Sequence, residues 1–564
     1  MKNQEVARIL YEIADILEIK GVEWKPIAYR KAARSIETLS EDIIDMYKKG
    51  RIEDIPGVGK NIAEKINELL RTGKLKYYNE LKKSVPIKLE ELNSVPSLGP
   101  KRIKILYDKL NIKNLKDLKK AAEKNKIREL NGFSSTLENE ILEGIKGIES
   151  TKTRLLLGYM YPFAKEIESK LSEQKFVEKA VIAGSMRRMK ETIHDVDILV
   201  TTTDSKKTID LFTSLPKKKL LAKGTTRASI ILHNGLQVDI RVLDNNHYGS
   251  GLHYFTGSKE HNIKLRNLAI RKGLKISEYG VFKGKKAMAT KTEEDVYKTL
   301  GLRYIEPELR EDNGEIEAAL KNKLPMLVGY NDIKGDLQMH TKYSDGSNSI
   351  EEMALKAKSL GRSYIAITDH YGRLAIANAL NKKRMLKQFN EIDRINKKIN
   401  GIKILKGAEV DINSEGNLDI DVSVLKELDI LVASIHSSFK NDNTKRIMKA
   451  MENKYVNVIG HPTGRIINRR NGYNLDFEKI FEKSKETNTF LEINSFPDRL
   501  DLNDINVRDA IKNKCKLIIN TDAHLSDHLD FMKFGIGTAR RGWATKNDII
   551  NTNKLDKFFK IIGK

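Results

Sequence analysis

Hydrophobic residues recur with a helical period over the first 150 residues. Apolar positions are spaced three or four residues apart in VARILYEIADILEI and in NIAEKINELL, which places them on one face of a helix. Glycine and proline interrupt this pattern at three places, residues 54–60, 94–100 and 130–134. The pattern therefore predicts a helical N-terminal part with tight turns between its helices.

After residue 150 the apolar runs become shorter and typical of strands. Three of them, residues 180–185, 194–200 and 236–242, lie in the middle of the chain. From residue 335 onward, strand-like runs alternate with helical patterns, which is typical of a parallel (β/α) barrel. There are seven such runs: GDLQMH, YIAIT, IKILKGAEVDI, ILVASIH, VNVIGHP, TFLEINS and KLIINTDAH.

Length and composition narrow the class of protein. The 564 residues predict several domains, and the 40% of hydrophobic residues is enough for several cores. The single cysteine, Cys515, excludes a disulfide framework. No apolar run is long enough to span a membrane, and the first twenty residues mix acids with apolar residues, unlike a secretion signal. We therefore expect a cytoplasmic protein with no membrane partner.

The charge balance indicates the kind of partner. Lysine and arginine total 102 against 77 acidic residues, a net charge of +25. An excess of this size favours a polyanion, and nucleic acid is the first candidate. A general lysine bias is an alternative partial cause, so the charge supports nucleic-acid binding without establishing it.

The first interruption, Asp54 to Lys60, is typical of a turn that holds a nucleic-acid backbone. Gly57 and Gly59 allow positive φ angles and the close approach of a phosphate. The helix that follows begins with unpaired N–H groups, and Lys60 adds a positive charge there. An ordinary turn between helices is the alternative; it stays open for the second interruption and is favoured for the third.

Three aspartates in the middle segment are candidate metal ligands. Asp195 and Asp197 are two residues apart on a predicted strand, so both side chains project to one side, and Asp239 lies in a third strand-like run. Such carboxylates can hold two Mg²⁺ or Mn²⁺ ions, which activate an attacking hydroxyl and stabilise a leaving pyrophosphate. The turn before them suits a triphosphate. The residues of that turn are Gly184, Ser185 and Arg188.

The last third of the chain concentrates histidine. Six of the eleven histidines follow residue 330, and five of these end apolar runs. In a parallel barrel, residues at strand ends meet at one face. Mixed imidazole and carboxylate ligands suit Zn²⁺, Mn²⁺ or Fe²⁺, and clustered metals can activate water against a phosphate ester. The candidate ligands are His340, Asp345, His370, Glu409, His436, His461, Asp522 and His524.

The middle segment resembles the palm and thumb of the family X DNA polymerases, and the hairpin segments resemble the N-terminal domains of that family. The runs that carry the resemblance are GSMRRMKETIHDVDILV, QVDIR and YFTGSKEHNIKLRNLAIRKGLKISEYGVF. The resemblance implies catalytic metals at the three aspartates. The implied nucleotide contacts are Gly184, Ser185, Arg188, Tyr254, Phe255, Gly257 and Asn262. The implied DNA contacts are Lys25, Tyr29, Gly57, Gly59, Lys60 and Arg266, with Lys65 as the Schiff-base lysine.

The chain departs from the family pattern at a few positions. Met189 and His194 stand where the family often has glycine, and Asn61 stands where a lysine is common. Because His194 adds a side chain at a point of close backbone approach, we expect it to alter how the triphosphate is held. The departures near Lys65 leave lyase activity open.

The seven runs of the last third resemble the PHP (polymerase and histidinol phosphatase) domain. The opening His-x-His of that domain is Gln338-Met339-His340 here, and an amide is a poorer ligand than an imidazole, so we expect one ion to bind weakly. The resemblance implies up to three Mn²⁺, Zn²⁺ or Fe²⁺ ions and a 3′→5′ exonuclease, with AP endonuclease or 3′-phosphatase activity as further possibilities. Three arginines could hold substrate phosphates, with a solvated loop as the alternative. They are Arg465, Arg469 and Arg470.

Taken together, the sequence predicts a multidomain α+β and α/β protein. The expected domains are 1–85 (lyase-like, helix-hairpin-helix), 86–150 (fingers-like), 151–243 (palm), 244–305 (thumb), 306–331 (linker) and 332–564 (PHP). We expect a monomer that fills short gaps in base-excision repair, using gapped or primed DNA and deoxynucleoside triphosphates. Two alternatives remain: a nucleotidyltransferase with a non-DNA acceptor, and a non-catalytic scaffold that binds DNA ends.

Overall fold

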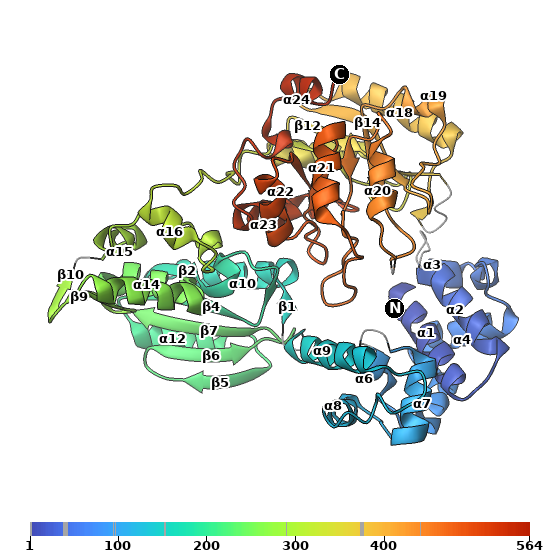
Figure 1. The fold of residues 1–564 in the computed structure, drawn as a ribbon, viewed down its shortest axis with the longest axis horizontal. Helices are drawn as coiled ribbons and strands as arrows, with labels where there is room; N and C mark the ends of the chain where they lie inside the picture. Colours follow the sequence, from blue (N-terminus) through green and yellow to red (C-terminus); the bar gives the residue numbers. More distant parts are fainter. Residues whose placement is uncertain are drawn as a thin grey trace. The chain divides into compact units, whose positions relative to one another are not determined.

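The computed structural model describes residues 3–37, 43–93, 95, 98–151, 154–288, 290–372, 377–439 and 441–564. The chain forms two compact units, which are described separately. The first comprises Met1–Thr153 with Arg373–Ala379, and the second comprises Arg154–Gly372 with Leu380–Lys564. Figure 1 colours the chain from its N-terminus to its C-terminus.

The first unit is helical, as the apolar spacing predicts. Its apolar helix faces meet in one core that includes Leu10, Ile66 and Leu106. The elements are α1 (Asn3–Ile19), α2 (Trp24–Glu37), α3 (Ile43–Lys48), η1 (Ile52–Asp54), α4 (Lys60–Thr72), α5 (Lys76–Ser84), α6 (Leu89–Asn93), α7 (Pro100–Leu110), α8 (Leu115–Glu123) and α9 (Ser135–Thr151).

The turn between η1 and α4 requires glycine. Gly57 has φ +83°, and a Cβ atom there would lie 2.8 Å from Cγ of Lys31. Gly59 is the N-cap of α4 and leaves the helix N–H groups without a side-chain cap. The first predicted turn is therefore present. In the second segment, Ser94, Pro96 and Ser97 lie outside the described residues.

The second unit begins with the palm sheet, whose strand order is β2-β4-β7-β6-β5. Strands β4 and β7 are parallel, and the other neighbours are antiparallel. Alternating burial along β4 puts Val196 and Ile198 into the core and leaves Asp195 and Asp197 on the other face. The elements are β1 (Leu155–Leu156), α10 (Leu157–Ser172), β2 (Val177–Ile182), α11 (Gly184–Arg187), β3 (Thr192–Ile193), β4 (Asp195–Thr202), α12 (Ser205–Ser214), β5 (Lys219–Lys223), β6 (Arg227–Ile231) and β7 (Gln237–Leu243).

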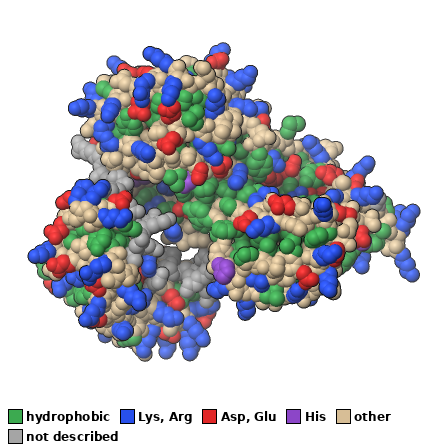
Figure 2. All heavy atoms as spheres, turned by 180° about the vertical axis from the view of Figure 1, so that it is seen from behind, with side chains coloured by type: hydrophobic (Ala, Val, Ile, Leu, Met, Phe, Trp, Pro, Cys, Tyr) green, Lys and Arg blue, Asp and Glu red, His purple; other side chains and the backbone are tan. Residues whose placement is uncertain are grey.

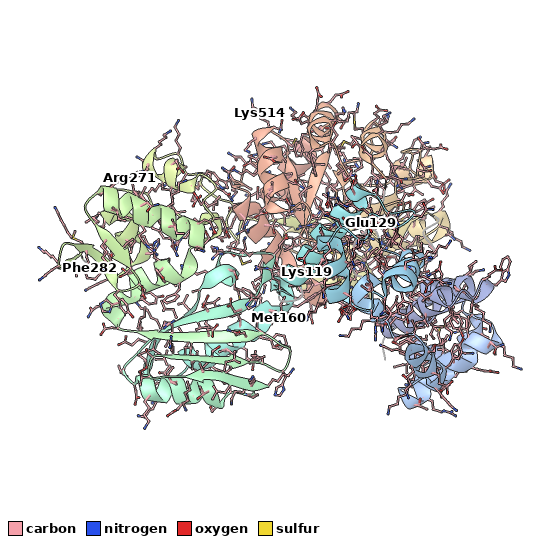
Figure 3. All side chains as sticks on the ribbon, turned by 60° about the horizontal axis from the view of Figure 1, so that its bottom comes forward. Lys119, Glu129, Met160, Arg271, Phe282 and Lys514 are labelled. Atoms are coloured by element: carbon pink, nitrogen blue, oxygen red, sulfur yellow. The ribbon has the colours of Figure 1, made fainter. Side chains whose placement is uncertain are left out.

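The thumb follows the palm sheet, and Figure 3 shows Arg271 at the end of α14 and Phe282 on β9. Residues 306–331, predicted as a linker, contain η3 and α16, and Leu309 and Ile316 are buried in the thumb core. The segment is therefore packed. The elements are η2 (Asn245–His247), α13 (Tyr248–Thr256), α14 (Lys259–Arg271), β8 (Lys275–Ser277), β9 (Gly280–Lys283), β10 (Lys286–Met288), α15 (Glu293–Thr299), η3 (Pro307–Leu309) and α16 (Glu315–Leu320).

The last third is the predicted parallel barrel. Its strand order is β11-β12-β14-β15-β16-β17-β18, with β13 paired to β14. A parallel bridge between Met339 and Ala523 brings the first and last strands together, so the barrel of seven strands is nearly closed. The strands are β11 (Gly335–Asp336), β12 (Tyr364–Ile367), β13 (His370–Tyr371), β14 (Lys403–Asp411), β15 (Ile430–Ser434), β16 (Val458–Ile459), β17 (Phe490–Asn494) and β18 (Leu517–Asn520).

Helices alternate with the barrel strands along the chain, which is the connection that parallel strands need. They are α17 (Ile350–Ser359), α18 (Lys382–Lys398), α19 (Val422–Leu425), α20 (Thr444–Met451), α21 (Phe477–Thr487), α22 (Asp504–Lys512), η5 (Ser526–Phe531), α23 (Met532–Arg541), η6 (Ile550–Thr552) and α24 (Leu555–Ile561).

The palm sheet and the barrel share a hydrophobic core. Leu500 and Phe534 of the barrel belong to the cluster formed by the palm residues. A Cβ atom on Gly158 of α10 would lie 2.6 Å from the side chain of Pro497, so the two parts pack without a gap there. This packing explains why the palm and the barrel belong to the same compact unit.

Two surface properties of the described residues bear on partners. None of their helices combines the length and apolar character needed to cross a membrane. Figure 2 shows lysine and arginine side chains spread over the visible face rather than gathered in one tail. The positive charge on this face therefore belongs to folded parts of the chain.

Candidate active sites

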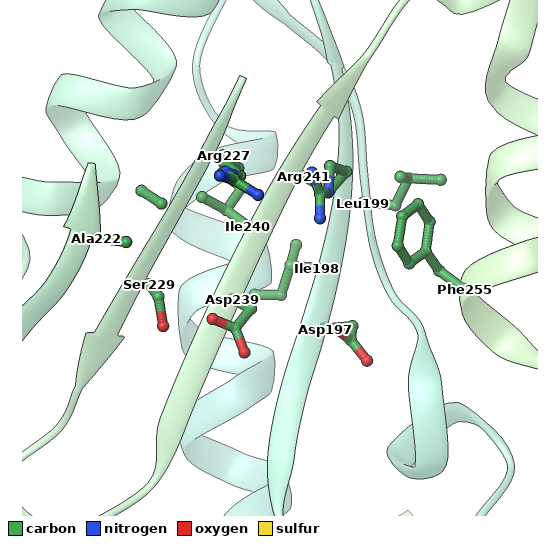
Figure 4. Close-up of a pocket in the computed structure, with 11 residues that line it drawn as sticks. Asp197, Ile198, Leu199, Ala222, Arg227, Ser229, Asp239, Ile240, Arg241 and Phe255 are labelled. Atoms are coloured by element: carbon green, nitrogen blue, oxygen red, sulfur yellow. The ribbon is translucent and has the colours of Figure 1, made fainter. Parts of the chain in front are cut away.

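The palm site lies on one face of the parallel strands β4 and β7. Asp197 and Asp239 are register partners on these parallel strands, and Asp195 precedes Asp197 by two residues. Asp197 and Asp239 line a pocket of about 300 Å³ together with Phe255 of α13, and Figure 4 labels these three side chains. The three predicted aspartates therefore share one face of one sheet.

The electrostatics of this face favour a divalent cation. Burial raises the pKa of Asp197 to about 7, and the charges of Asp195 and Asp239 add to the effect. Arg188 and Arg241 oppose the shift without cancelling it. The three carboxylates are not fully neutralised by the two arginines. Because Mg²⁺ and Mn²⁺ prefer carboxylate oxygens as ligands, these residues fit the predicted ions.

The turn before β4 approaches Asp197 closely because it contains glycine. Gly184 has φ +62°, and a Cβ atom there would lie 2.5 Å from Oδ2 of Asp197. The backbone N–H of Ala183 also donates to the carbonyl oxygen of Asp197 at 2.8 Å. Ser185 is the second residue of α11 and directly follows Gly184.

Arg188 follows α11 and is buried. Its Nε donates to Oε1 of Glu311 at 2.9 Å, and its NH1 donates to the carbonyl oxygen of Thr256 at 2.8 Å. Met189, at the position where glycine was expected, adopts a left-handed φ of +52°. His194 is exposed, with Nδ1 3.6 Å from Oδ2 of Asp195.

Helices α13 and α14 supply the remaining predicted nucleotide residues. The rings of Tyr254 and Phe255 pack edge to face at 5.2 Å. Nδ2 of Asn262 donates to the carbonyl oxygen of Tyr254 at 2.8 Å. A Cβ atom on Gly257 would lie 2.4 Å from Oδ1 of Asn262, so glycine is needed there. Arg266 is exposed on α14.

In the first unit, the ring of Tyr77 contacts both Lys65 and Tyr29. The sequence analysis did not single out Tyr77. The Nζ of Lys65 donates to the carbonyl oxygen of Asn61 at 3.0 Å and lies 5.0 Å from the ring centre of Tyr77. Tyr77 in turn stacks on Tyr29 at 6.4 Å. Lys25, on the first turn of α2, is exposed.

The barrel site is organised around Glu409, which is almost fully buried. Four imidazoles surround its two carboxylate oxygens. The shortest nitrogen–oxygen distances to Glu409 are 3.3 Å for His340, 3.4 Å for His370, 3.5 Å for His436 and 3.2 Å for His461. The ends of several different strands therefore meet at one carboxylate.

A second carboxylate, Asp345, lies between two further imidazole nitrogens. Its Oδ2 is 3.5 Å from Nε2 of His370 and 3.5 Å from Nε2 of His524. Asp522 completes the site, with Oδ1 3.2 Å from Nε2 of His340. All eight predicted barrel ligands are thus brought together. Among the described residues, the groups of ligand atoms within 4.8 Å of one another all lie here, and the palm aspartates are less tightly gathered.

The donor geometry of the barrel site fits metal ions. Both ring nitrogens of His340 and the Nδ1 atoms of His436 and His461 are buried without a hydrogen-bond partner among the described residues. Burial by itself would raise the pKa of Glu409, but His370 and the other imidazoles outweigh it and hold that pKa well below its ordinary value. Buried imidazole nitrogens and ionised carboxylates that lie close together supply the nitrogen and oxygen ligands that a site for divalent cations requires.

Gln338 also lies in the buried interior of the barrel. Both atoms of its amide are buried without a hydrogen-bond partner in the described part of the chain. Its Oε1 is close to the metal-site loop, since a Cβ atom on Gly460, next to His461, would lie 3.3 Å from it. The amide therefore occupies interior space beside the predicted ligands.

Four further residues support this site and were missed from the sequence: Asp369, Asp411, Glu492 and Arg499. Oδ1 of Asp411 accepts the backbone N–H of His436 at 2.9 Å, and Nε of Arg499 lies 3.6 Å from Oδ2 of Asp522. Asp411 could have been found, because it lies two residues after Glu409 on one strand. Arg499 follows no periodic pattern.

Four family models match separate parts of the chain. The helix-hairpin-helix domain model matches residues 1–75, and the model of a SAM-like helix-hairpin-helix tandem matches residues 89–146. The model of the DNA polymerase beta thumb matches residues 251–311, and the PHP domain model matches residues 336–496.

Described proteins from other organisms are similar to this chain over different parts of its length. The DNA polymerase/3′-5′ exonuclease PolX of Bacillus subtilis (strain 168) is 38% identical over 564 residues, covering 98% of each chain. DNA polymerase lambda of Rattus norvegicus is 28% identical over 345 residues, which cover 55% of this chain and 56% of that protein. A probable phosphatase of Thermoanaerobacter sp. (strain X514) is 32% identical over 241 residues, covering 40% of this chain and 94% of that protein.

Proposed function

The chain belongs to the family X DNA polymerases with a C-terminal PHP domain, and from this premise we propose that it fills short DNA gaps in base-excision repair and trims 3′ ends. The observation that carries the proposal is the presence of two separate acidic sites in one chain, the Asp197–Asp239 face and the cluster around Glu409. Both acid-rich sites suit divalent metals, which the two families use. The helix-hairpin-helix domains favour DNA over a small-molecule acceptor.

At the palm site, we assign the aspartates to metal binding and the neighbouring turn to the nucleotide. Divalent ions, Mg²⁺ or Mn²⁺, would supply activation of the primer hydroxyl and stabilisation of the leaving pyrophosphate. Ser185 and Arg188 would hold the triphosphate, since a hydroxyl and a guanidinium match phosphate oxygens. Tyr254 would line the sugar side, where an aromatic ring leaves no room for a 2′-hydroxyl.

At the barrel site, we assign the eight clustered residues to Mn²⁺, Zn²⁺ or Fe²⁺. These ions would supply a metal-activated water for attack on a phosphodiester. Arg499 stands at the edge of the cluster beside Asp522 and would orient the phosphate being cleaved. A 3′→5′ exonuclease needs this arrangement, and the same chemistry would serve a 3′-phosphatase or AP endonuclease.

The proposed domain boundaries are those expected from the sequence, 1–85, 86–150, 151–243, 244–305 and 332–564, except that residues 306–331 are assigned to the thumb and not to a linker. The first two would grip DNA through Gly57, Gly59 and Lys60, with Lys25 and Tyr29 at the end of the strand. The proposed partners are gapped or primed DNA and deoxynucleoside triphosphates. A monomer in the cytoplasm stays a prediction.

One gel tests the two activities together. A 5′-labelled primer in a short-gap duplex bearing a 5′-phosphate is incubated with the protein and Mn²⁺, with and without deoxynucleotides. We expect a longer primer with nucleotides and a shorter one without them. Asp197→Ala should abolish only the lengthening, and His436→Ala only the shortening, because the two residues belong to separate sites.

Two exposed residues provide matched controls. Asp210→Ala removes an acid on α12 that pairs with Lys223, away from the aspartate face, and His233→Ala removes an exposed histidine. Neither should change either product. Lengthening without shortening would reject the nuclease and leave a structural barrel, and no change in either lane would favour a scaffold that binds DNA ends.

A further inference from the structure

The turn that carries Arg188 is contacted by the barrel. Oε1 of Glu311 accepts hydrogen bonds from Nε of Arg188 at 2.9 Å and from NH1 of Arg541 at 2.8 Å. Arg541 is the last residue of barrel helix α23. The same NH1 donates to the backbone carbonyl oxygen of Arg188 at 3.0 Å. One barrel arginine therefore holds both the backbone and, through Glu311, the side chain of Arg188.

Arg541 is itself held in place. Asp504 of α22 accepts from its Nε at 2.9 Å and lies 2.7 Å from its NH2. The side chains of Arg188, Glu311 and Arg541 are at most 10% exposed. A buried ion pair is sensitive to the loss of one member, since the remaining charge is left without a partner. This network therefore defines the position of the Arg188 guanidinium.

The pKa of Glu311 lies below its ordinary value. Burial alone would raise its pKa, but Arg541, Arg188 and Lys190 outweigh the burial and lower the pKa to about 2. The three cations share one carboxylate, and Nζ of Lys190 lies 3.6 Å from its Oε2. Loss of the charge on Glu311 would release three basic side chains at once.

Two more contacts bind the turn to the barrel. A Cβ atom on Gly537 of α23 would lie 2.8 Å from Cβ of Met189, so the helix backbone packs directly against that side chain. NH2 of Arg465 donates to Oε2 of Glu191 at 2.6 Å. Arg465 was considered above for substrate phosphate, but this bond turns it toward the palm. The palm turn thus rests on the barrel at three successive points.

We propose that Glu311 and Arg541 are positioning residues for the polymerase reaction, and that the barrel thereby forms part of the support of the nucleotide site. The inference rests on the proposed role of Arg188 in holding the triphosphate. Nε and NH1 of Arg188 are occupied by protein acceptors. Among the described residues, NH2 has no hydrogen-bond partner and is left for a phosphate oxygen.

The expected kinetic effect follows from the role of Glu311 and Arg541 in supporting the residue that binds the triphosphate. A group that holds the triphosphate equally in the bound complex and during reaction changes the KM of the nucleotide and leaves kcat nearly unaltered. In the full-length protein, Glu311→Gln and Arg541→Gln should each raise the KM for the incoming deoxynucleotide by about tenfold. Single-nucleotide insertion on a gapped primer measures this, and Mn²⁺-dependent exonuclease activity should stay within twofold.

The double variant distinguishes a role in positioning Arg188 from a general loss of protein stability. Because Arg541 and Glu311 belong to one hydrogen-bonded network around Arg188, the effects of the two substitutions should not be additive, and the Glu311→Gln/Arg541→Gln variant should have a KM well below the product of the two separate increases. Arg541→Lys keeps a positive charge near Glu311 and should restore part of the affinity. Where Glu311→Gln lowers the melting temperature too far, Glu311→Asp keeps the charge and tests the reach of the side chain.

The matched control is the neighbouring ion pair of Glu308 and Arg540. It has similar burial, with Nε of Arg540 2.7 Å from Oε1 of Glu308, and it does not contact the Arg188 turn. Glu308→Gln should leave the nucleotide KM unchanged, and an equal rise there would overturn the inference. A lower KM in Glu311→Gln would also overturn it, since Glu311 would then compete with the nucleotide. If Arg188→Ala itself leaves KM unchanged, the proposed role of Arg188 fails instead.

Discussion

Asp197 on β4 and Asp239 on β7 are register partners across two parallel strands, so their carboxylates leave the sheet on the same face. Burial and the neighbouring acids raise the pKa of Asp197 to about 7. An acid with a raised pKa stabilises the fold below its ordinary value of 3.8, and this contribution is lost as the pH rises through about 7. A divalent cation offsets that loss because it binds the ionised form.

Metal binding at the palm should therefore depend on pH. Protons compete with Mg²⁺ below pH 7, so we expect the apparent affinity to rise by up to about tenfold per unit between pH 6 and 7 and to level off above pH 7. The rise in melting temperature with added Mg²⁺ at pH 6, 7 and 8 measures this. In Asp197→Asn the rise should lose its pH dependence, and equal rises in the unaltered protein at all three values would contradict the prediction.

Gly184→Ala should disable the palm site alone. The added Cβ would lie 2.5 Å from Oδ2 of Asp197, at a φ of +62° that alanine tolerates poorly. We expect a loss of about 100-fold in kcat/KM for nucleotide insertion, with unchanged exonuclease activity.

Gly235→Ala is the control for the effect of placing alanine at a positive φ angle. Gly235 has φ +88° and no neighbour within 4 Å of the added atom, so the change should cost about 1 kcal/mol of stability and leave insertion intact. If both variants lose insertion equally, backbone strain rather than contact with Asp197 is the cause.

Gln338→His should strengthen metal binding in the barrel. The amide of Gln338 is fully buried and has no hydrogen-bond partner within the described segments, and imidazole is the better ligand for Mn²⁺ or Zn²⁺. We expect about tenfold less Mn²⁺ to be needed for half-maximal exonuclease activity. Metal retained after dialysis, measured by mass spectrometry, gives a readout independent of activity. Gln338→Ala should not gain metal, and a loss of metal in Gln338→His would show that the pocket cannot accept the ring.

Lys65 should be the residue that forms a Schiff base with an incised abasic site, if the protein has lyase activity. Its amine lies over the ring of Tyr77, which stacks on Tyr29. Borohydride should then trap a covalent complex with DNA, which Lys65→Ala abolishes. Lys83→Ala, an exposed lysine on α5, is the control. Trapping that survives in Lys65→Ala would assign the chemistry to another amine.

Regular patterns in the chain predicted most of the architecture. The period of apolar residues correctly predicted helices in the first unit, and the seven apolar runs correctly predicted the barrel. The clustering of the candidate barrel ligands was also predictable, because His436, His461 and Asp522 each follow a buried strand. Parallel strands bring their carboxyl ends to one face, so spacing alone implied that these side chains would meet.

Contacts between distant segments could not be predicted in this way. Nothing periodic relates Arg541 to Arg188, which lie 353 residues apart yet share Glu311. Tyr77 and Arg499 were missed for the same reason, and residues 306–331 were expected to be a linker because breaks in a pattern do not reveal packing.

The sequence by itself determined which chemistry the chain carries, because ligand types, glycine turns and strand periods are local properties. Only the tertiary structure decided how the two chemistries are joined, with α23 of the barrel packed against the Met189 turn of the palm. The reason is physical: side-chain packing and buried ion pairs depend on positions in space that are remote in sequence, and their energies appear only when both surfaces have been brought together.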